Sequence, residues 1–408
     1  MPIQVSYMGT KRKIAPQVAA IIGNGPKGPL LDLFSGICAI GSEVAPSRPI
    51  WCNDIQLFAS TVAAAFFTSS ELPVSYDVAA EIAFEAFQEN KAALERVYAL
   101  QLKNERTAIA SKNFHLLAAL EHEIPVVSSN AKMERERIRL ASAPTAAPYR
   151  LFSIIFAGGY LGLSQSIEID SIRYAIDQLS RQKNINEEQH RWMCLALCQA
   201  TSKVATTTGH FAQFMKVKTT TIPRFVAQRS RSVWHEWLRA IFKFEPLSTR
   251  SWRARNLVFR EEAVSLLDQL YKKNKKPSII YADPPYTSDH YSRYYHLYET
   301  LLKYDYPPSN GIGRYRPDRF ASHFSTKSKV REAVDNLIAA SAQLGSVLVL
   351  SYPGSGLLPE AEAAITSMIK RHYGNGGEIA RLVHSHSSLG ASKGSQNYAV
   401  NELIFIAG

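Results

Sequence analysis

A four-residue motif, Asp283-Pro284-Pro285-Tyr286, combines residue types that can bind an amino group on a planar ring. It follows the apolar run SIIYA, which predicts a position at the carboxyl end of a buried strand, where open α/β sheets place their ligands. The two prolines fix φ and leave the carbonyls before them without a continuing ladder. The Asp283 carboxylate and the Pro284 carbonyl could then each accept a hydrogen bond from an N–H of the amino group, while Tyr286 stacks on the ring. A proline-rich turn that merely ends a core strand is the alternative.

A second pattern, near the N-terminus, is typical of a pocket for a nucleoside cofactor. The apolar run PLLDLF precedes the loop SGICAIG, in which glycine lets backbone N–H groups approach a ligand closely. Asp54 ends the next apolar run, where an acid can accept both hydroxyls of a ribose. The full G-x-G-x-x-G fingerprint is absent, because Cys38 stands at the second glycine position, and ordinary strand-to-helix turns are the alternative. The candidate residues around the loop are Asp32, Phe34, Ser35, Gly36 and Gly41.

Both motifs require strands whose carboxyl ends meet, and the hydrophobic pattern predicts such a scaffold. Short apolar runs alternate with helical stretches in the first 60 residues and again from Asn256 onward. This rhythm implies a mostly parallel sheet covered by helices on both faces, that is, a doubly wound α/β fold. The expected strands lie within residues 29–34, 48–54, 256–260, 278–286, 345–356, 378–385 and 401–408.

A long stretch of helical character separates the two halves of this pattern. Residues 57–140 are rich in Ala, Glu, Lys, Leu and Gln at helical spacing, and further helices are expected at 167–180 and 187–203. We therefore expect residues 1–70 and 250–408 to form one discontinuous α/β domain, interrupted by a helical, basic insertion of residues 71–249.

The charge of the chain favours a polyanionic partner. Lys and Arg total 47 against 35 Asp and Glu, a net charge of +12, and each phosphate neutralised releases condensed counterions. Residues 200–256 hold eleven basic residues and two acids, interleaved with side chains suited to phosphate and base contacts. A solvated basic helix surface is the alternative. If that polyanion is a nucleic acid, the candidate residues for contact with it are Arg224, Arg229, Arg231, Arg253 and Arg255.

Composition excludes several classes of protein. Hydrophobic residues make up 46% and charged residues 20%, which excludes a disordered chain. No apolar run reaches the ~18–20 residues of a membrane helix, and the N-terminus lacks the apolar region of a signal peptide. The four cysteines form no disulfide-scaffold pattern. We expect a soluble, cytoplasmic protein, and we favour a monomer.

Three weaker features admit both a functional and a structural interpretation. His190, Cys194 and Cys198 share one predicted helix face and could ligate a metal, but core packing is favoured and no metal site is predicted. The turn Ser351–Gly356 could flank the pocket for the ring that the DPPY motif would bind, with a plain turn as the alternative. An aromatic cluster after the DPPY motif could line that pocket, wedge into a duplex, or pack as an amphipathic helix. Its members are His290, Tyr291, Tyr294, Tyr295, His296 and Tyr298.

Four stretches of the chain, in this order, resemble the Dam-type class of N6-adenine DNA methyltransferases. They are YMGTKRK, DLFSGICAIG, YLGLSQSIEIDSIRYAID and DPPYTSDHYSRYYHLYETLLKYDYP. Their order, with the cofactor loop before the insertion and the insertion before DPPY, is similar to the α arrangement of amino-methyltransferases. The basic part of the insertion has no recognisable counterpart in this resemblance.

The resemblance implies a site-specific enzyme that transfers a methyl group from S-adenosylmethionine to the N6 amino group of an adenine flipped out of double-stranded DNA. The DPPY motif would be catalytic, and Tyr7 and Lys11 would join the cofactor residues. Glu262 would hold the cofactor adenine, with Glu261 as the competing candidate. The alternative is that these acids lie at a solvated helix N-terminus, where the helix dipole favours negative charge. A cognate restriction endonuclease could act separately. Methylation of cytosine N4, an RNA substrate, and a non-catalytic DNA-binding protein with a methyltransferase-like domain stay open as alternatives.

Overall fold

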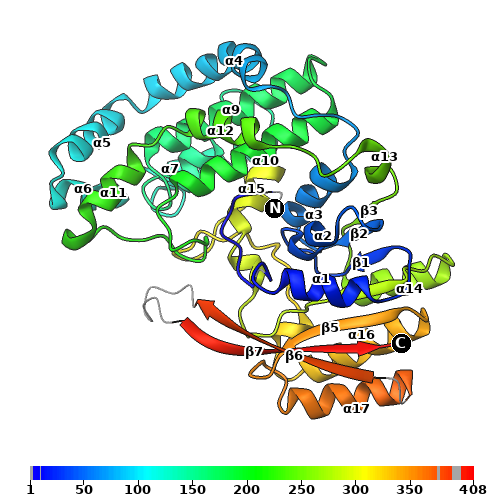
Figure 1. Ribbon diagram of the computed structural model, residues 1–408. Coiled ribbons are helices and arrows are strands. Elements are labelled where there is room, and N and C mark those ends of the chain that lie inside the picture. The colour runs from blue at the N-terminus through cyan, green and yellow to red at the C-terminus, as the bar shows by residue number, and fades with distance from the viewer. Residues whose placement is uncertain (1–2, 10, 375–376, 388–396) are drawn as a thin grey trace.

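The computed structural model describes residues 3–9, 11–374, 377–387 and 397–408, which contain a seven-stranded sheet (Figure 1). The strand order is β3-β2-β1-β4-β5-β7-β6. The first five strands in this order pair in parallel, whereas β7 runs antiparallel to both β5 and β6. The predicted doubly wound, mostly parallel fold is therefore confirmed. The strands are β1 (Leu30–Asp32), β2 (Ile50–Asn53), β3 (Leu257–Phe259), β4 (Ile279–Ala282), β5 (Val347–Pro353), β6 (Gly377–Ser387) and β7 (Asn397–Ala407).

Helices cover both faces of the sheet. Because successive strand residues point to opposite sides, each strand contributes side chains to both helical layers. Leu30 and Ile279 pack in the same core as α1, α2 and α3, whereas Leu31 and Ile280 pack with α14, α16 and α17. All four side chains are fully buried, which is why these strands appear in the sequence as continuous apolar runs. The helices of the two layers are α1 (Ala15–Gly23), α2 (Ala39–Val44), α3 (Leu57–Ala63), α14 (Ala263–Lys272), α16 (Val330–Gln343) and α17 (Ala361–Tyr373).

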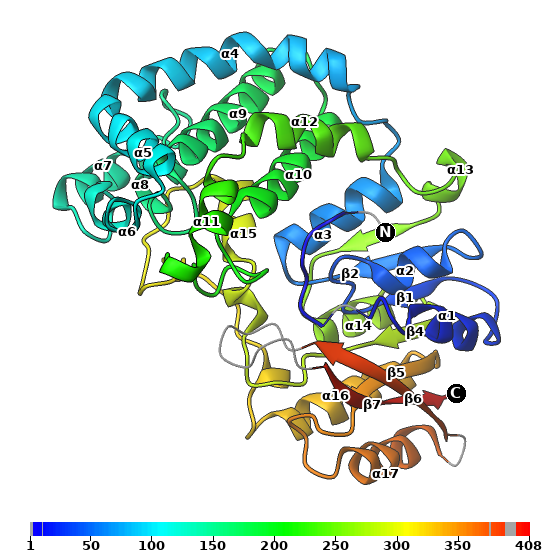
Figure 2. The same ribbon diagram turned by 60° about the vertical axis from the view of Figure 1, so that its left-hand side comes forward.

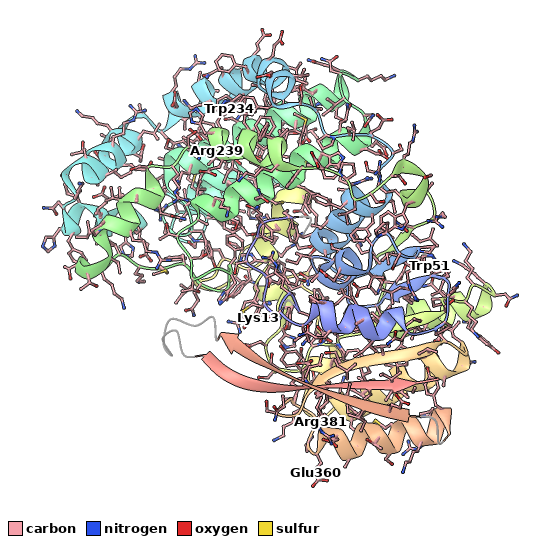
Figure 3. All side chains as sticks on the ribbon, in the orientation of Figure 1. Lys13, Trp51, Trp234, Arg239, Glu360 and Arg381 are labelled. Atoms are coloured by element: carbon pink, nitrogen blue, oxygen red, sulfur yellow. The ribbon has the colours of Figure 1, made fainter. Side chains whose placement is uncertain are left out.

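The residues between α3 and β3 form a helical lobe that lies beside the sheet (Figures 1 and 2). Figure 3 shows Trp234 and Arg239 in this lobe, and Glu360 and Arg381 near the opposite end of the molecule. The helices of this part of the chain are α4 (Tyr76–Val97), α5 (Ala99–Ser111), α6 (Phe114–Glu123), α7 (Ala131–Ala141), α8 (Leu151–Ile155), α9 (Leu163–Arg181), α10 (Glu187–Val204), α11 (Ile222–Arg229), α12 (Val233–Lys243) and α13 (Arg250–Arg253), with the short turns η1 (Ala64–Thr68) and η2 (Thr219–Thr221).

Capping side chains set where helices of the lobe begin. Asn186 accepts a hydrogen bond from the backbone N–H of Gln189 at 2.9 Å and starts α10. Glu168 of α9 accepts from the backbone N–H groups of Val233 and Trp234, which fixes the start of α12 against α9. No helix in the described part of the chain combines the length and apolar character needed to cross a membrane.

Helix α15 (His296–Lys303) follows the DPPY motif in sequence but packs against the helical lobe. Tyr304, directly after this helix, donates a hydrogen bond to Oδ1 of Asp170 on α9 at 2.6 Å. Asp170 is fully buried and also accepts from the backbone N–H groups of Phe152 and Ser153. The segment after the motif thus ties the lobe to the sheet, and one apolar core continues from the sheet into the lobe. The remaining short turns are η3 (Tyr291–Arg293) and η4 (His323–Ser325).

Candidate active site

A cavity of about 420 Å³ opens at the carboxyl ends of β1, β2 and β4. In an open α/β sheet this is the position where ligands bind, and the volume lies in the range of small-molecule sites. Of the residues that the sequence analysis assigned to catalysis or to the cofactor, all but Gly41 line this cavity; Gly41, on α2, instead lies close to Phe67 and Ile50. The residues that line it are Tyr7, Lys11, Asp32, Phe34, Ser35, Gly36, Asp54, Glu262, Asp283, Pro284, Pro285 and Tyr286.

Asp54 holds the glycine loop against the end of β2. Its Oδ2 atom accepts a hydrogen bond from the backbone N–H of Gly36 at 3.0 Å, and its Oδ1 atom accepts from that of Gln56 at 2.9 Å. Burial raises the pKa of Asp54 to about 6, against the backbone hydrogen bonds that lower it. Each carboxylate oxygen has a second lone pair. The carboxylate can therefore support the loop and also accept from a hydroxyl-bearing ligand.

Gly36 allows the N-terminal segment to pass close over the loop. Its φ of +50° lies in the left-handed region, and a Cβ atom there would lie 2.9 Å from Cε1 of Tyr7. Tyr7 stacks on Tyr295 with ring centroids 4.3 Å apart, and its hydroxyl accepts a hydrogen bond from Nε2 of Gln56 at 3.0 Å. The missing side chain at position 36 thus lets an aromatic ring form one wall of the cavity.

Two polar atoms near the loop are buried and accept or donate no hydrogen bond within the described residues. They are Oδ2 of Asp32 and Oγ of Ser35, and both residues line the cavity. Burial, aided by the nearby carboxylate of Asp283, raises the pKa of Asp32 to about 7. A buried polar group without a partner is costly, so this part of the cavity suits a ligand that brings hydrogen-bond donors and positive charge.

The wall beyond β3 combines acids with aromatic rings. Glu262 is the N-cap of α14, and its Oε2 atom accepts from the backbone N–H of Ser265 at 2.9 Å. Glu261 lines the same wall, while Phe34 and Phe324 meet edge to face with centroids 5.4 Å apart. The cap accounts for an acid at position 262 without any ligand, so its contact with a cofactor stays a proposal.

The DPPY motif forms the other end of the cavity, directly after β4. Oδ1 of Asp283 lies 3.2 Å from Nζ of Lys11, which makes an ion pair. The same Oδ1 atom is buried and has no hydrogen bond of good geometry among the described residues. Burial raises the pKa of Asp283 to about 7, the charge of Lys11 opposes this shift, and that of Glu402 adds to it. Nζ of Lys11 also lies 4.8 Å from the ring centroid of Tyr286. Lys11, which the resemblance assigned to the cofactor, is thus placed at the acceptor corner, the group formed by Asp283, Pro284 and Tyr286.

Glu402 completes this corner, and the sequence analysis did not assign it. It lies on β7 and accepts hydrogen bonds from Nζ of Lys11 at 2.9 Å and from Oγ of Ser351 at 2.5 Å. A signal was present, because Glu402 is the single charged residue in the run NELIFIAG. A carboxylate on a buried strand needs a partner inside the protein. Residues 320–324, before α16, also line the cavity and carry no motif that could have indicated this.

The five arginines proposed to contact DNA fall into an exposed and a buried group. The exposed group can reach a polyanion without rearrangement, and these residues are retained as candidates. The buried group has side chains that are 5–6% exposed and cannot meet a phosphate in this conformation. Exposed are Arg224, Arg231 and Arg255; buried are Arg229 and Arg253.

The DNA-contact predictions for Arg229 and Arg253 are therefore corrected. The Arg229 guanidinium donates to the carbonyl of Gly159 at 2.7 Å. The Arg253 guanidinium donates to the carbonyls of Ser69 and Ser248, each at 2.7 Å. The bonds of Arg253 to main-chain carbonyls order the surrounding loops, so this residue supports the fold. Arg229 makes one such bond, whereas its Nε and Nη1 atoms are buried without a hydrogen-bond partner among the described residues.

The weaker sequence features are mostly interior packing. Tyr291 lines the cavity, but four members of the aromatic cluster are buried. His190 bonds through Nε2 to Oδ1 of Asp177 at 2.8 Å, and the cysteines beside it on α10 are buried. Among the described residues, no group of three or more His, Cys, Asp or Glu side chains is arranged to hold a metal ion. The buried aromatic residues are Tyr294, Tyr295, His296 and Tyr298.

Comparison with known proteins agrees with this arrangement of motifs. Residues 227–351, which include the DPPY motif, match a family model. The match is to the D12 class of N6 adenine-specific DNA methyltransferases. The resemblance found in the sequence is thereby confirmed. The D12 match covers the end of the helical lobe and β3 to β5, whereas the glycine loop lies outside it.

Curated proteins that are similar in sequence to this chain are also named as methyltransferases. The chain is 28% identical over 214 residues to the Type II methyltransferase M.FokI of Planomicrobium okeanokoites, covering 52% of this chain and 29% of that protein. It is 21% identical over 409 residues to the Modification methylase StsI of Streptococcus sanguinis, covering 98% of this chain and 51% of that protein. The chain spans about half the length of the latter relative and less of the former.

Proposed function

We propose that this protein is a site-specific DNA methyltransferase that uses S-adenosylmethionine and methylates the N6 amino group of adenine. The observation that carries the proposal is the single cavity into which the glycine loop, Asp54 and the DPPY motif all open. Residues that sequence reasoning assigned to two different ligands thus face one space, as a group transfer between those ligands requires.

The residues at the two ends of the cavity support complementary roles. The cofactor, when bound, supplies an electrophilic methyl group on a positively charged sulfur. Asp32 and Asp54 offer carboxylates to its positive charge and ribose hydroxyls, and Glu262 offers one to its adenine. Unpaired Oδ2 of Asp32 and Oγ of Ser35 fit such a ligand, because it brings the donors that these buried atoms lack in the described structure.

The acceptor corner would orient the target base. The carboxylate of Asp283 and the carbonyl of Pro284 accept hydrogen bonds from the two N–H groups of the amino group, and Tyr286 stacks on the ring. These acceptors keep the nitrogen lone pair free to attack and stabilise the positive charge that develops as the nitrogen becomes four-bonded. Because pairing buries the amino group in a duplex, the adenine has to leave the helix first.

The helical lobe would supply most contacts to double-stranded DNA. We assign this role to residues 71–249 and the segment that follows them, with Arg224, Arg231 and Arg255 as phosphate or base contacts. These side chains are exposed, and the lobe lies beside the sheet whose strand ends form the cavity. The names of the relatives favour a setting in which a separate restriction endonuclease cuts the same site.

The test is transfer of a labelled methyl group from S-adenosylmethionine to duplex DNA, single-stranded DNA and RNA of the same sequence. Duplex DNA is expected to take most label. Preferential labelling of RNA would replace the proposed substrate. Saturable DNA binding with no label on any polymer would instead support a non-catalytic DNA-binding protein. The ionisable Asp283 at the cavity argues against that second candidate.

A further inference from the structure

Glu402 is a carboxylate in the interior of the protein, next to the acceptor corner. Its side chain is 1% exposed, and the strand around it is apolar, with Leu403, Ile404 and Phe405 buried. In the sheet register it pairs with Pro353 of β5 and Leu382 of β6. Burying an ionised carboxylate in such a place is expensive unless it is paired.

The carboxylate is held by groups from two other parts of the chain. Nζ of Lys11 lies 2.9 Å from Oε1 of Glu402 and 3.2 Å from Oδ1 of Asp283, so one ammonium bridges two carboxylates. Oγ of Ser351, on β5, donates to the same Oε1 atom. The N-terminal segment, β4, β5 and β7 are therefore joined at one buried point, with Asp283 at the end that faces the cavity.

The balance of charge at this point gives Glu402 a consequence for the reaction. With all three groups ionised, one ammonium and two carboxylates carry a net negative charge. Without Glu402, the ammonium of Lys11 would neutralise Asp283. A neutral acceptor corner would lose the electrostatic stabilisation of a nitrogen that becomes positive as it is methylated.

We propose that Glu402 is a positioning residue for methyl transfer, which holds the Lys11 ammonium so that it orients Asp283 without cancelling its negative charge. This inference rests on the proposed function. Ser351 supports the same arrangement by fixing the Glu402 carboxylate. The residue acts through Lys11 and Asp283 and does not itself touch the substrate.

The other groups around the corner allow the direction of a pH effect to be derived. Asp283 is faced by Lys11, Glu402, Tyr281, Tyr286, Tyr291 and Asp32. Burial raises the pKa of Asp283 to about 7, Lys11 lowers it, and Glu402 raises it. Removing the charge of Glu402 is therefore expected to lower the pKa of Asp283, and removing the charge of Lys11 to raise it.

The test compares Glu402→Gln and Lys11→Met with the wild-type protein. kcat and KM for DNA are measured from pH 5.5 to 9, with cofactor affinity by calorimetry and the melting temperature. For Glu402→Gln we expect kcat on the alkaline plateau to fall about tenfold or more. KM and cofactor affinity should stay within about threefold. The acid limb, the part of the pH profile where kcat falls as Asp283 is protonated, should move to lower pH.

Lys11→Met should move that acid limb to higher pH. Glu362→Gln is the matched control, because Glu362 is half-exposed and pairs with Arg381 on the surface, and it should leave kcat and the limb unchanged.

Three results would overturn the proposal or its basis. A Glu402→Gln protein with wild-type kcat and an unmoved acid limb would remove the role of Glu402. If that variant does not fold, the pH profile of Lys11→Met tests the proposal instead. An acid limb of kcat that does not move in Lys11→Met would show that Lys11 does not influence Asp283, and the role of Glu402 depends on that influence. Absence of methyl transfer by the wild-type protein would reject the proposed function instead, so the two failures are distinguishable.

Discussion

The Nζ atom of Lys11 lies 3.2 Å from the Oδ1 atom of Asp283, so the segment that precedes α1 contacts the motif that follows β4. This ion pair is largely buried, with the two side chains 6% and 14% exposed. It closes the acceptor end of the cavity from the side of the N-terminal segment. The active site is therefore assembled from segments that lie on both sides of the helical lobe in sequence.

Replacing Asp283 separates chemistry from cofactor binding. Asp283→Asn keeps the shape of the side chain but removes the charge that faces the target amino group. We expect methyl transfer to fall by about a hundredfold or more. Cofactor affinity should stay within about threefold, because the loop at the opposite end of the cavity holds the cofactor.

Single-turnover experiments measure the rate of methyl transfer by Asp283→Asn, and calorimetry measures its cofactor affinity. Asp335→Asn, at a surface pair with Arg371, is the control. Activity of Asp283→Asn within tenfold of wild type would contradict the assignment.

Replacing Asp54 should have the opposite profile. Asp54→Ala removes the acceptor proposed for the ribose hydroxyls, and hydrogen bonds to charged groups are worth about 1.5–3 kcal/mol. Cofactor affinity should then fall about ten- to a hundredfold, as measured by calorimetry. Because Asp54 also binds the backbone N–H of Gly36, the melting temperature of the variant is measured alongside. Unchanged affinity in a folded variant would rule out the proposed contact.

Stability should depend on pH through the buried carboxylates of the cavity. The pKa values of Asp32 and Asp283 are raised to about 7 and that of Asp54 to about 6. An unfolded Asp ionises near ~3.9, so their contribution to stability is full below that pH and is lost as pH rises toward about 7. The melting temperature without ligand should fall from pH 5 to pH 8, and Asp32→Asn should reduce this fall. An equal fall in Asp32→Asn and wild type would show that Asp32 does not titrate as described.

The exposed and buried arginines should give different phenotypes. Arg224→Ala and Arg231→Ala should weaken DNA binding and reduce the salt dependence of log K by about 0.9 if each contacts one phosphate. Arg253→Ala should mainly lower the melting temperature, because its guanidinium binds interior carbonyls. Arg371→Ala, on α17 away from the lobe, is the control for loss of one surface charge. Unaltered affinity and salt slope in all exposed variants would argue against DNA contacts by these arginines.

Much of the sheet and of the cavity could be predicted because those features are local in sequence. Leu30, Leu31, Ile279 and Ile280 are consecutive apolar residues, and such runs are the mark of strands covered on both faces. The DPPY and glycine-loop residues likewise carry their chemistry in their spacing. Their convergence on one cavity followed from the rule that parallel strands place their carboxyl ends at one edge.

What could not be predicted depends on tertiary contacts between distant segments. A count of charges cannot distinguish Arg253, whose guanidinium binds interior carbonyls, from Arg255, which is exposed two residues later. Nor does the sequence reveal that Lys11 bridges Asp283 and Glu402, since this requires the antiparallel pairing of β7 with β5. Only a lone acid in an apolar strand pointed to Glu402.

The most direct measurement is nucleoside analysis by mass spectrometry of duplex DNA incubated with S-adenosylmethionine and either wild-type protein or Asp283→Asn. The account predicts N6-methyldeoxyadenosine with the wild-type protein and a loss of this product with the variant. Methylation of cytosine alone, no methylated nucleoside with the wild-type protein, or equal product from both proteins would contradict it.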